Sequence, residues 1–193
     1  MKQSLFTVEH TRQLTEDTYE MVLSGDTSDI TAPGQFVNIA LPGKSLRRPI
    51  SVANWDKGAL LLLIRVMGDG TRELVRSVPG TELDILSGLG NGFNLEGCPE
   101  NPILIGGGVG AAPLFGLAGR LRARGSTPTV ALGFRTGKDA FYLKEFASLG
   151  CRLFISTEDG SPGGDRVHHR LCLRAHAHAE GRVVPAGADG RAV

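Results

Sequence analysis

The chain has 193 residues, of which 41% are hydrophobic, and its formal net charge is +1. This length allows one large or two small domains, and the near-neutral charge argues against nucleic acid or an acidic membrane surface as the main partner. The longest apolar run, residues 59–64, is strand-sized and far below the roughly 20 residues that cross a bilayer. The first residues show no signal-peptide pattern and the cysteines form no closely spaced pair, so we expect a reduced, cytoplasmic protein.

Residues 1–97 are predicted to form a β domain. Turns that contain Gly, Pro or Asp separate short runs of branched and aromatic residues, which are residues 5–8, 19–23, 35–40, 50–54, 59–66 and 82–86. Six strands at this spacing favour a closed barrel or a sandwich. One helix is expected in this part, over residues 71–77.

Residues 98–163 have a different pattern. Strands are predicted at 103–105, 129–134 and 151–157, with helices between them at 112–124 and 143–149. Strands that alternate with helices are typical of a parallel α/β domain. Three strands make an incomplete domain of this kind.

Residues 164–193 break the pattern. They contain four of the five histidines but no Ile, Phe, Tyr, Trp or Lys, and no convincing strand or amphipathic helix. We expect this segment to be disordered, because it has too little apolar surface to offset the entropy lost on ordering. The alternative is a metal site, although the spacing matches no closed zinc motif; its ligands would be His168, His169, His176 and His178.

The first motif that can carry chemistry is Arg48, Pro49, Ile50 and Ser51. Arginine offers a planar fork of donors suited to a phosphate, proline fixes the backbone, and serine offers a hydroxyl to a polar ring atom. Taken alone, the motif is better explained as a surface arginine pair in front of a strand.

A second motif, residues 68–71, contains Gly70 and Thr71 and precedes the expected helix. Glycine allows a close backbone approach, Thr71 can cap the helix, and free N–H groups at a helix start favour a diphosphate. An ordinary strand-to-helix turn explains this motif as well.

A longer glycine-rich run, residues 106–113, connects the first strand of the α/β part to its first helix. Strand, glycine loop and helix follow in the order found in nucleotide-binding proteins, and Pro113 suits a first helical turn. The run lacks the standard dinucleotide fingerprint, so a tight turn without a ligand is the alternative. Glu158 and Asp159 follow the third strand, at the edge where such sheets bind ligands, or form a solvated turn.

The order of the motifs is more specific than any one of them. Arg-Pro-x-Ser, Gly-x-Gly-Thr, Leu-Gly-Asn-Gly-Phe and Gly-Gly-Gly-x-Gly-x-Ala-Pro follow one another along the chain. In this order they resemble the ferredoxin reductase superfamily, over about residues 1–163. Within it the chain is most similar to the electron-transfer subunit of NAD-dependent dihydroorotate dehydrogenase, through residues 47–51, 89–93 and 133–135.

The resemblance implies a Greek-key six-stranded β-barrel that binds FAD, residues 1–97, and an incomplete NAD-binding α/β domain, residues 98–163. The residues implied along FAD, with Arg48 near its phosphate and the diphosphate at the helix start, are Arg48, Pro49, Ile50, Ser51, Leu63, Ile64, Arg65, Gly70 and Thr71. Those implied at the nicotinamide nucleotide are Gly106, Gly107, Gly108, Gly110, Ala111, Pro113, Glu158 and Asp159. No side chain is expected to be catalytic, because the cofactor supplies the redox chemistry.

The resemblance also implies an electron route in pyrimidine biosynthesis. FAD would exchange a hydride with NAD(H), and electrons would pass singly through a [2Fe–2S] cluster to an FMN-containing dihydroorotate dehydrogenase catalytic subunit in a heterotetramer. The family's cluster is held by four closely placed cysteines near the C-terminus. This chain has only Cys98, Cys151 and Cys172, so we expect it not to hold the cluster.

The departure from the family begins near Gly164 and suggests a truncated or scrambled C-terminus. Codons exist for residues 165–172 that, read one nucleotide later, encode the family's pattern. We therefore hypothesise a shifted reading frame over residues 164–193. Two other functions fit the sequence: a different ferredoxin reductase-type NAD(P)H oxidoreductase subunit, and a redox-dead module that only binds its partner.

Overall fold

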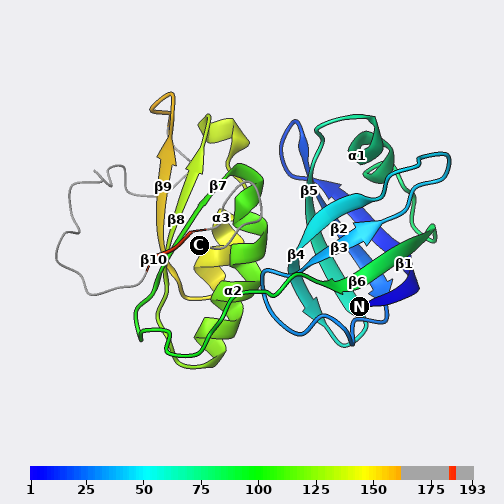
Figure 1. Ribbon diagram of the computed structural model, residues 1–193. Coiled ribbons are helices and arrows are strands. Elements are labelled where there is room, and N and C mark those ends of the chain that lie inside the picture. Colours follow the sequence, from blue (N-terminus) through cyan, green and yellow to red (C-terminus); the bar gives the residue numbers. More distant parts are fainter. Residues whose placement is uncertain (162–182, 186–193) are drawn as a thin grey trace. The chain divides into compact units, whose positions relative to one another are not determined.

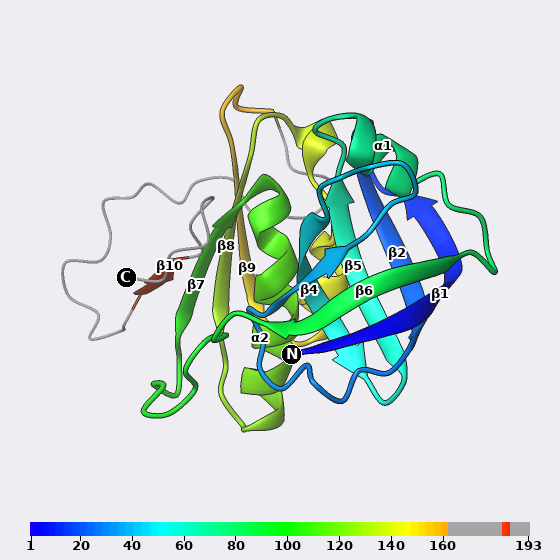
Figure 2. The same ribbon diagram turned by 45° about the vertical axis from the view of Figure 1, so that its right-hand side comes forward.

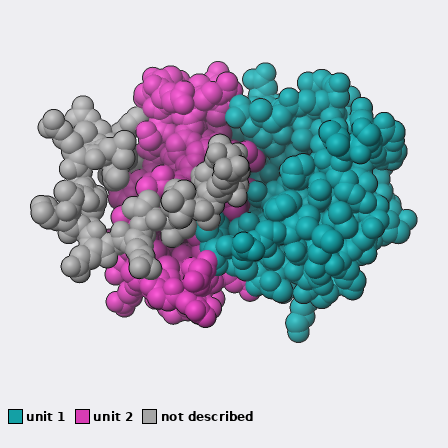
Figure 3. All heavy atoms as spheres, in the orientation of Figure 1, with its two compact units in different colours: residues 1–93 teal, residues 94–193 magenta. Residues whose placement is uncertain are grey.

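The computed structural model describes residues 1–161 and the backbone of residues 183–185. The chain divides into two compact units, Met1–Phe93 and Asn94–Val193, which Figure 3 shows in two colours. No helix in the described ranges is both long and apolar enough to cross a membrane.

The first unit is a closed barrel of six antiparallel strands (Figure 2). Around the barrel the order is β1-β2-β5-β4-β3-β6, and β6 pairs with β1 to close it. The barrel predicted from the sequence is therefore confirmed. Its strands are β1 (Lys2–Gln13), β2 (Thr18–Gly25), β3 (Phe36–Ile39), β4 (Arg48–Asp56), β5 (Ala59–Arg65) and β6 (Glu82–Leu89).

Alternating apolar side chains fill the barrel. Phe6 and Val8 of β1 point inward, and so do Met21 and Leu23 of β2, each at most 1% exposed. A period of two places such residues on one face of a strand, which is why these segments form half-buried strands.

Two elements of the first unit differ from the prediction. β1 is longer than residues 5–8, and its register with β2 shifts between Val8 and His10; polar residues at both ends hide its length in the sequence. The helix α1 (Asp69–Leu74) begins earlier than predicted, because Gly68 already serves as its N-cap.

The second unit contains a parallel sheet in the order β10-β7-β8-β9. The strand–helix alternation predicted from the sequence is confirmed. The elements are β7 (Ile103–Gly107), η1 (Gly108–Gly110), α2 (Ala111–Ala123), β8 (Thr129–Phe134), η2 (Gly137–Asp139), α3 (Leu143–Ser148), β9 (Arg152–Thr157) and β10 (Val183–Pro185).

Both α-helices of this unit lie on the same side of the sheet (Figure 1). Leu104, Val130 and Leu132 of the sheet are buried, and so are Leu114 and Leu117 of α2. Phe115 of α2 also makes edge-to-face contacts with aromatic rings in and next to α3. The short helix η1 connects the carboxyl end of β7 to the first turn of α2.

The segment after residue 161 is described only at β10. This strand pairs in parallel with β7 from Val183 to Pro185, where the sequence showed no convincing strand. The four histidines of the alternative metal site lie outside the described residues, as does Cys172.

Candidate cofactor sites

The two arginines at the start of β4 have different surroundings. Arg47 binds the Asp84 carboxylate through both terminal nitrogens, at 3.2 and 2.8 Å, and donates to the Asn38 carbonyl. Arg48 donates to the Leu46 carbonyl at 2.6 Å and has no carboxylate partner within residues 1–161. Arg47 therefore ties β4 to β3 and β6, and Arg48 is the arginine that remains available for an anion.

Arg48 lies against Gly70, which brings the first two sequence motifs together. A Cβ on Gly70 would lie 1.9 Å from Arg48 Nε and 2.5 Å from its Cζ, so any side chain there would displace the guanidinium. Gly70 lies in the first turn of α1, where backbone N–H groups have no partner within the helix. A cation and free backbone donors thus share one location.

The strands β4 and β5 pair along only part of their length. Their shared register begins at the hairpin between them and ends at Val52 and Leu62. Beyond that point residues 48–51 of β4 pair with β3, and residues 63–65 of β5 pair with β2. Residues 48–51 of β4 therefore have an unpaired edge on the side of β5, and residues 63–65 of β5 have one on the side of β4.

Ser51 is exposed at the point where the two strands part. The Val52 N–H donates to the Gln35 carbonyl on the β3 side at 3.0 Å. Because N–H groups alternate in direction along a strand, the Ser51 N–H points to the β5 side. Ser51 is exposed, as is Pro49, whereas Ile50 packs partly against the barrel core.

The three β5 residues of the predicted site contribute unequally. Ile64 is fully buried in the barrel core, which leaves only its backbone for contact with a cofactor. Leu63 is 1% exposed and points to the opposite face of the strand. The Arg65 side chain donates to Asp17 Oδ2 at 2.7 Å.

Asp17 holds the end of β5, and sequence reasoning gave no sign of it. Besides the Arg65 contact, its backbone carbonyl accepts the Val66 N–H at 2.7 Å. Partial burial acts to raise the pKa of the Asp17 carboxyl, but hydrogen bonds from Arg65, Thr18 and Thr15 outweigh it and hold the pKa below its ordinary value. Asp17 and Arg65 are 48 positions apart, so no local pattern announces the pair.

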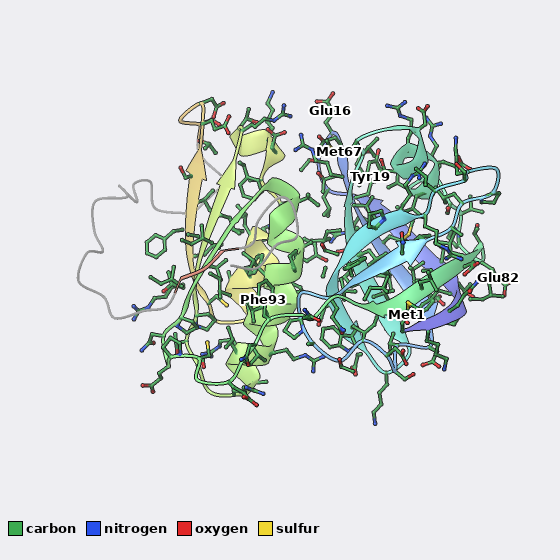
Figure 4. The ribbon with its side chains drawn as sticks, in the orientation of Figure 1. Met1, Glu16, Tyr19, Met67, Glu82 and Phe93 are labelled. Atoms are coloured by element: carbon green, nitrogen blue, oxygen red, sulfur yellow. The ribbon has the colours of Figure 1, made fainter. Side chains whose placement is uncertain are left out.

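Thr71 stabilises the turn before α1 from inside the helix. Its hydroxyl accepts the N–H groups of Met67 and Gly68, at 2.9 and 3.3 Å. Thr71 thus caps the start of the helix, but it does so as the third helical residue, by reaching back to the turn, and the N-cap residue is Gly68. Met67, labelled in Figure 4, is 78% exposed beside this turn.

The glycine run of the second unit contains two kinds of glycine. A Cβ on Gly106 would lie 2.7 Å from Leu114 Cδ1, because α2 packs closely on β7, and Gly108 has a left-handed φ of 51°. A Cβ on Gly110 would meet nothing within 4 Å, and one on Gly107 would make only an ordinary contact with the Gly133 carbonyl. The fold thus requires Gly106 and Gly108 but leaves free space beside Gly107 and Gly110.

The start of α2 follows this loop directly. Ala111 is the first residue of the helix and Pro113 lies in its first turn, which contains no acidic residue. The helix has 13 residues, so its free N–H groups and dipole favour an anion at this end. The carboxyl end of β7, the free space beside the glycines and the helix start therefore coincide.

Glu158 and Asp159 follow β9 in an exposed turn. The Glu158 N–H donates to the Phe134 carbonyl at 3.1 Å, which ties the turn to the end of β8. Hydrogen bonds from the Ser161 side chain and N–H hold the pKa of the Asp159 carboxyl below its ordinary value. Asp159 therefore shapes the turn, while the exposed Glu158 side chain is free to meet a ligand.

Within residues 1–161, no group of three or more His, Cys, Asp or Glu side chains is arranged to hold a metal ion. Cys98 and Cys151 are both free and partly buried. Burial raises the pKa of the Cys151 thiol, and the nearby Arg122 offsets this only in part.

Solved structures share this fold. A chain from the study of the NADH-dependent reduced ferredoxin-NADP oxidoreductase superposes with a TM-score of 0.73 at 31% identity, over 82% of this chain and 58% of that one. An Amycolatopsis cytochrome P450 reductase gives a TM-score of 0.73 at 25% identity, over 83% and 54%. The barrel and the parallel sheet thus define a ferredoxin reductase-like pair of units.

Sequence relatives narrow this class to a family. "Dihydroorotate dehydrogenase B (NAD(+)), electron transfer subunit" of Bacillus caldolyticus is 40% identical over 165 residues, which cover 81% of this chain and 64% of the relative. The protein of the same name from Geobacillus sp. (strain WCH70) is 38% identical over 183 residues, covering 88% and 71%. No family model matches the chain.

The chain belongs to the family of dihydroorotate dehydrogenase B electron transfer subunits. It spans about 64% of the length of the Bacillus caldolyticus relative.

Proposed function

We propose that this chain binds FAD on its barrel unit and a nicotinamide nucleotide on its α/β unit, and carries electrons between NAD(H) and a dihydroorotate dehydrogenase catalytic subunit. The names of its relatives support the reaction and the partner. The observation that carries the flavin assignment is the parting of β4 from β5 beside the Arg48–Gly70 contact. Two unpaired strand edges, a cation and a helix start within one unit suit a flat, polar ring system joined to a diphosphate.

Each residue of the barrel site has a role in this proposal. The Arg48 guanidinium and the backbone donors near Gly70 and Thr71 bind the diphosphate. The N–H and hydroxyl of Ser51 and the backbone of residues 63–65 hydrogen-bond the flavin ring. Pro49 keeps the edge of β4 free of one N–H group and fixes its direction.

The glycine run serves the nucleotide in the second unit. The free space beside Gly107 and Gly110 admits its backbone, and the start of α2 at Ala111 binds its phosphates. Glu158 accepts a hydrogen bond from a ribose or amide group. Gly106, Gly108 and Pro113 act indirectly, by fixing how closely the loop and helix pack.

The protein's part in the reaction is binding and orientation. A bound flavin supplies reversible hydride exchange with nicotinamide and one-electron exchange with later carriers. Backbone N–H groups and the Arg48 side chain hold the two nucleotides by their phosphates, Ser51 and the backbone of residues 63–65 hydrogen-bond the flavin edge, and we assign no side chain a proton-transfer step.

An iron–sulfur cluster does not fit this chain. A [2Fe–2S] centre of the family type needs four thiolates, and the sequence has three cysteines far apart. Cys98 and Cys151, the two in the described part, belong to no cluster of metal-ligating side chains. We therefore propose no electron step through such a centre in this polypeptide.

Replacing Arg48 tests the flavin assignment. We expect Arg48→Ala to weaken FAD binding about 10- to 100-fold, since a charge-assisted hydrogen bond to phosphate is lost. Lys57→Ala removes the same charge at the far end of β4, in the exposed hairpin turn, and serves as the matched control. FAD affinity is measured by titration of flavin fluorescence. If both variants bind FAD equally well, Arg48 does not bind the diphosphate and the proposed flavin site is wrong.

One observation favours a second candidate function. The 31% identical neighbour comes from a ferredoxin-NADP oxidoreductase study, so a subunit that serves ferredoxin rather than dihydroorotate is the alternative. Reduction of the bound flavin by a dihydroorotate dehydrogenase catalytic subunit with dihydroorotate supports the first proposal. Reduction by ferredoxin alone supports the second.

A further inference from the structure

Gln35 joins three segments of the barrel beside the point where β4 and β5 part. The residue is 6% exposed, and both ends of its amide are hydrogen-bonded. Oε1 accepts the N–H groups of Thr31 and Ala32 at 2.7 and 3.1 Å, and Nε2 donates to the Gly90 carbonyl at 3.0 Å. A buried amide satisfied in this way favours one arrangement of its surroundings.

The segments on either side of the amide, residues 31–35 and the loop 88–93, interlock. The Phe93 N–H donates to the Pro33 carbonyl at 2.7 Å. A Cβ on Gly34 would lie 2.7 Å from the Phe93 ring, and one on Gly92 would lie 2.6 Å from Ala32 Cβ. Phe93, labelled in Figure 4, ends the barrel unit. The glycine-rich loop at 89–93 thus has a structural role that its sequence did not reveal.

The backbone of Gln35 connects this lock to the flavin strand. Its carbonyl accepts the Val52 N–H at 3.0 Å. Val52 is the β4 residue at which the pairing with β5 ends, counted from the hairpin that joins the two strands. The next residue, Phe36, is the first of β3 and pairs with both Ser51 and Leu89. A shift of Gln35 would therefore move the corner at which β4 leaves β5.

We propose that Gln35 is a positioning residue of the flavin site, which fixes the Ser51–Val52 corner by locking residues 31–35 to the loop 88–93. Its amide is buried and bonded at both ends to Thr31, Ala32 and Gly90, so we assign it an effect through Ser51 and no contact with the cofactor. This inference rests on the proposed function, because it concerns the same flavin site.

The test replaces Gln35 by Glu and by Met. A carboxylic acid reproduces the donor and acceptor of the amide, whereas a carboxylate loses the donor that faces the Gly90 carbonyl, and burial favours the neutral form. We expect Gln35→Glu to bind FAD as the wild type does at about pH 5.5 and about 10-fold more weakly at about pH 8, with an altered visible flavin spectrum. Gln35→Met has no donor and should bind more weakly at both pH values.

Two further variants separate positioning from loss of stability. Leu23→Ala destabilises the core near the hairpin of β4 and β5, away from the unpaired edges, and should leave the FAD affinity of the folded protein and its spectrum unchanged. Phe93→Leu loosens the same lock without introducing a charge, and should weaken FAD binding even if the Gln35 variants do not fold.

The outcomes are distinct for the two proposals. Wild-type FAD affinity and spectrum in Gln35→Met, or in Phe93→Leu if the Gln35 variants do not fold, would overturn the role of Gln35 while leaving the flavin site in place. A wild-type protein that binds no FAD would overturn the proposed function, and this inference with it.

Discussion

At the scale of single residues, contacts with residues distant in sequence give two residues of the same type different roles. Arg47 and Arg48 are adjacent, yet Arg47 is committed to Asp84, 37 positions away, and Arg48 to the region of Gly70. Among the glycines of the second unit, Gly106 is required by the packing of α2, and Gly110 is not. The sequence motif identifies these arginines and glycines together. Only their tertiary contacts show which of them the fold needs and which remain available to a ligand.

The glycines of the nucleotide site allow a matched pair of variants. Gly110→Ala should keep or slightly raise the free energy of unfolding, by up to about 1 kcal/mol, because its backbone is already right-handed helical and a Cβ meets nothing. We expect it to weaken NADH binding several-fold by occupying the ligand's space. Gly106→Ala should instead lower the free energy of unfolding by roughly 1–3 kcal/mol, because Leu114 must move.

Denaturant unfolding and NADH titration of both glycine variants check this division. Loss of stability in Gly110→Ala equal to that in Gly106→Ala would show that Gly110 is structural and not kept for a ligand.

The Asp17–Arg65 pair predicts a pH dependence of stability. The pKa of Asp17 is lowered in the folded state, so the pair stabilises the protein above the unfolded-state pKa of about 4, and this stability is lost as the pH falls through the folded-state pKa. The pair is partly exposed, so its contribution is at most about 1 kcal/mol. Asp17→Asn should therefore be less stable than the wild type at neutral pH, and this difference should shrink below about pH 4. A difference in unfolding free energy that grows toward acid would contradict the assignment.

At the scale of elements, the sequence predicted most of what the structure contains. Runs of branched and aromatic residues between turn signals located the six barrel strands, and strand–helix alternation located the parallel sheet. It missed the length of β1, whose ends are polar, and it placed α1 too late because Thr71 reaches back to a turn at Gly68. The parting of β4 from β5 was not predictable either, because both segments have ordinary strand propensity and only pairing in three dimensions separates them.

Hydrogen exchange can detect the parted strands directly. Without FAD, we expect the Ser51 amide to exchange quickly, because it points to the side from which β5 has departed. The neighbouring Val52 amide, bonded to Gln35, should be protected with or without FAD. Saturating FAD should slow exchange at Ser51 and leave Val52 unchanged; a Ser51 amide already protected in the FAD-free protein would contradict an open edge.

At the scale of the whole molecule, the chain combines a complete barrel with a sheet whose described strands carry helices on one side. It spans about 64% of a relative's length, and its three cysteines cannot replace the four thiolates of a family-type cluster. The shifted reading frame over residues 164–193 stays a proposal. The nucleotide sequence across codons 160–193 tests it, since an early stop or a missing cysteine cluster in the shifted frame would refute it.

A titration with FAD is the most direct test of the proposed flavin site. Flavin-free protein is titrated with FAD, and bound flavin is quantified from its visible spectrum and after release by denaturation. We predict saturable binding at one FAD per chain, tighter than that of riboflavin, because Arg48 and the start of α1 bind the diphosphate. A correctly folded protein that shows no saturable FAD binding, or that binds riboflavin equally well, would contradict a flavin site that holds the diphosphate.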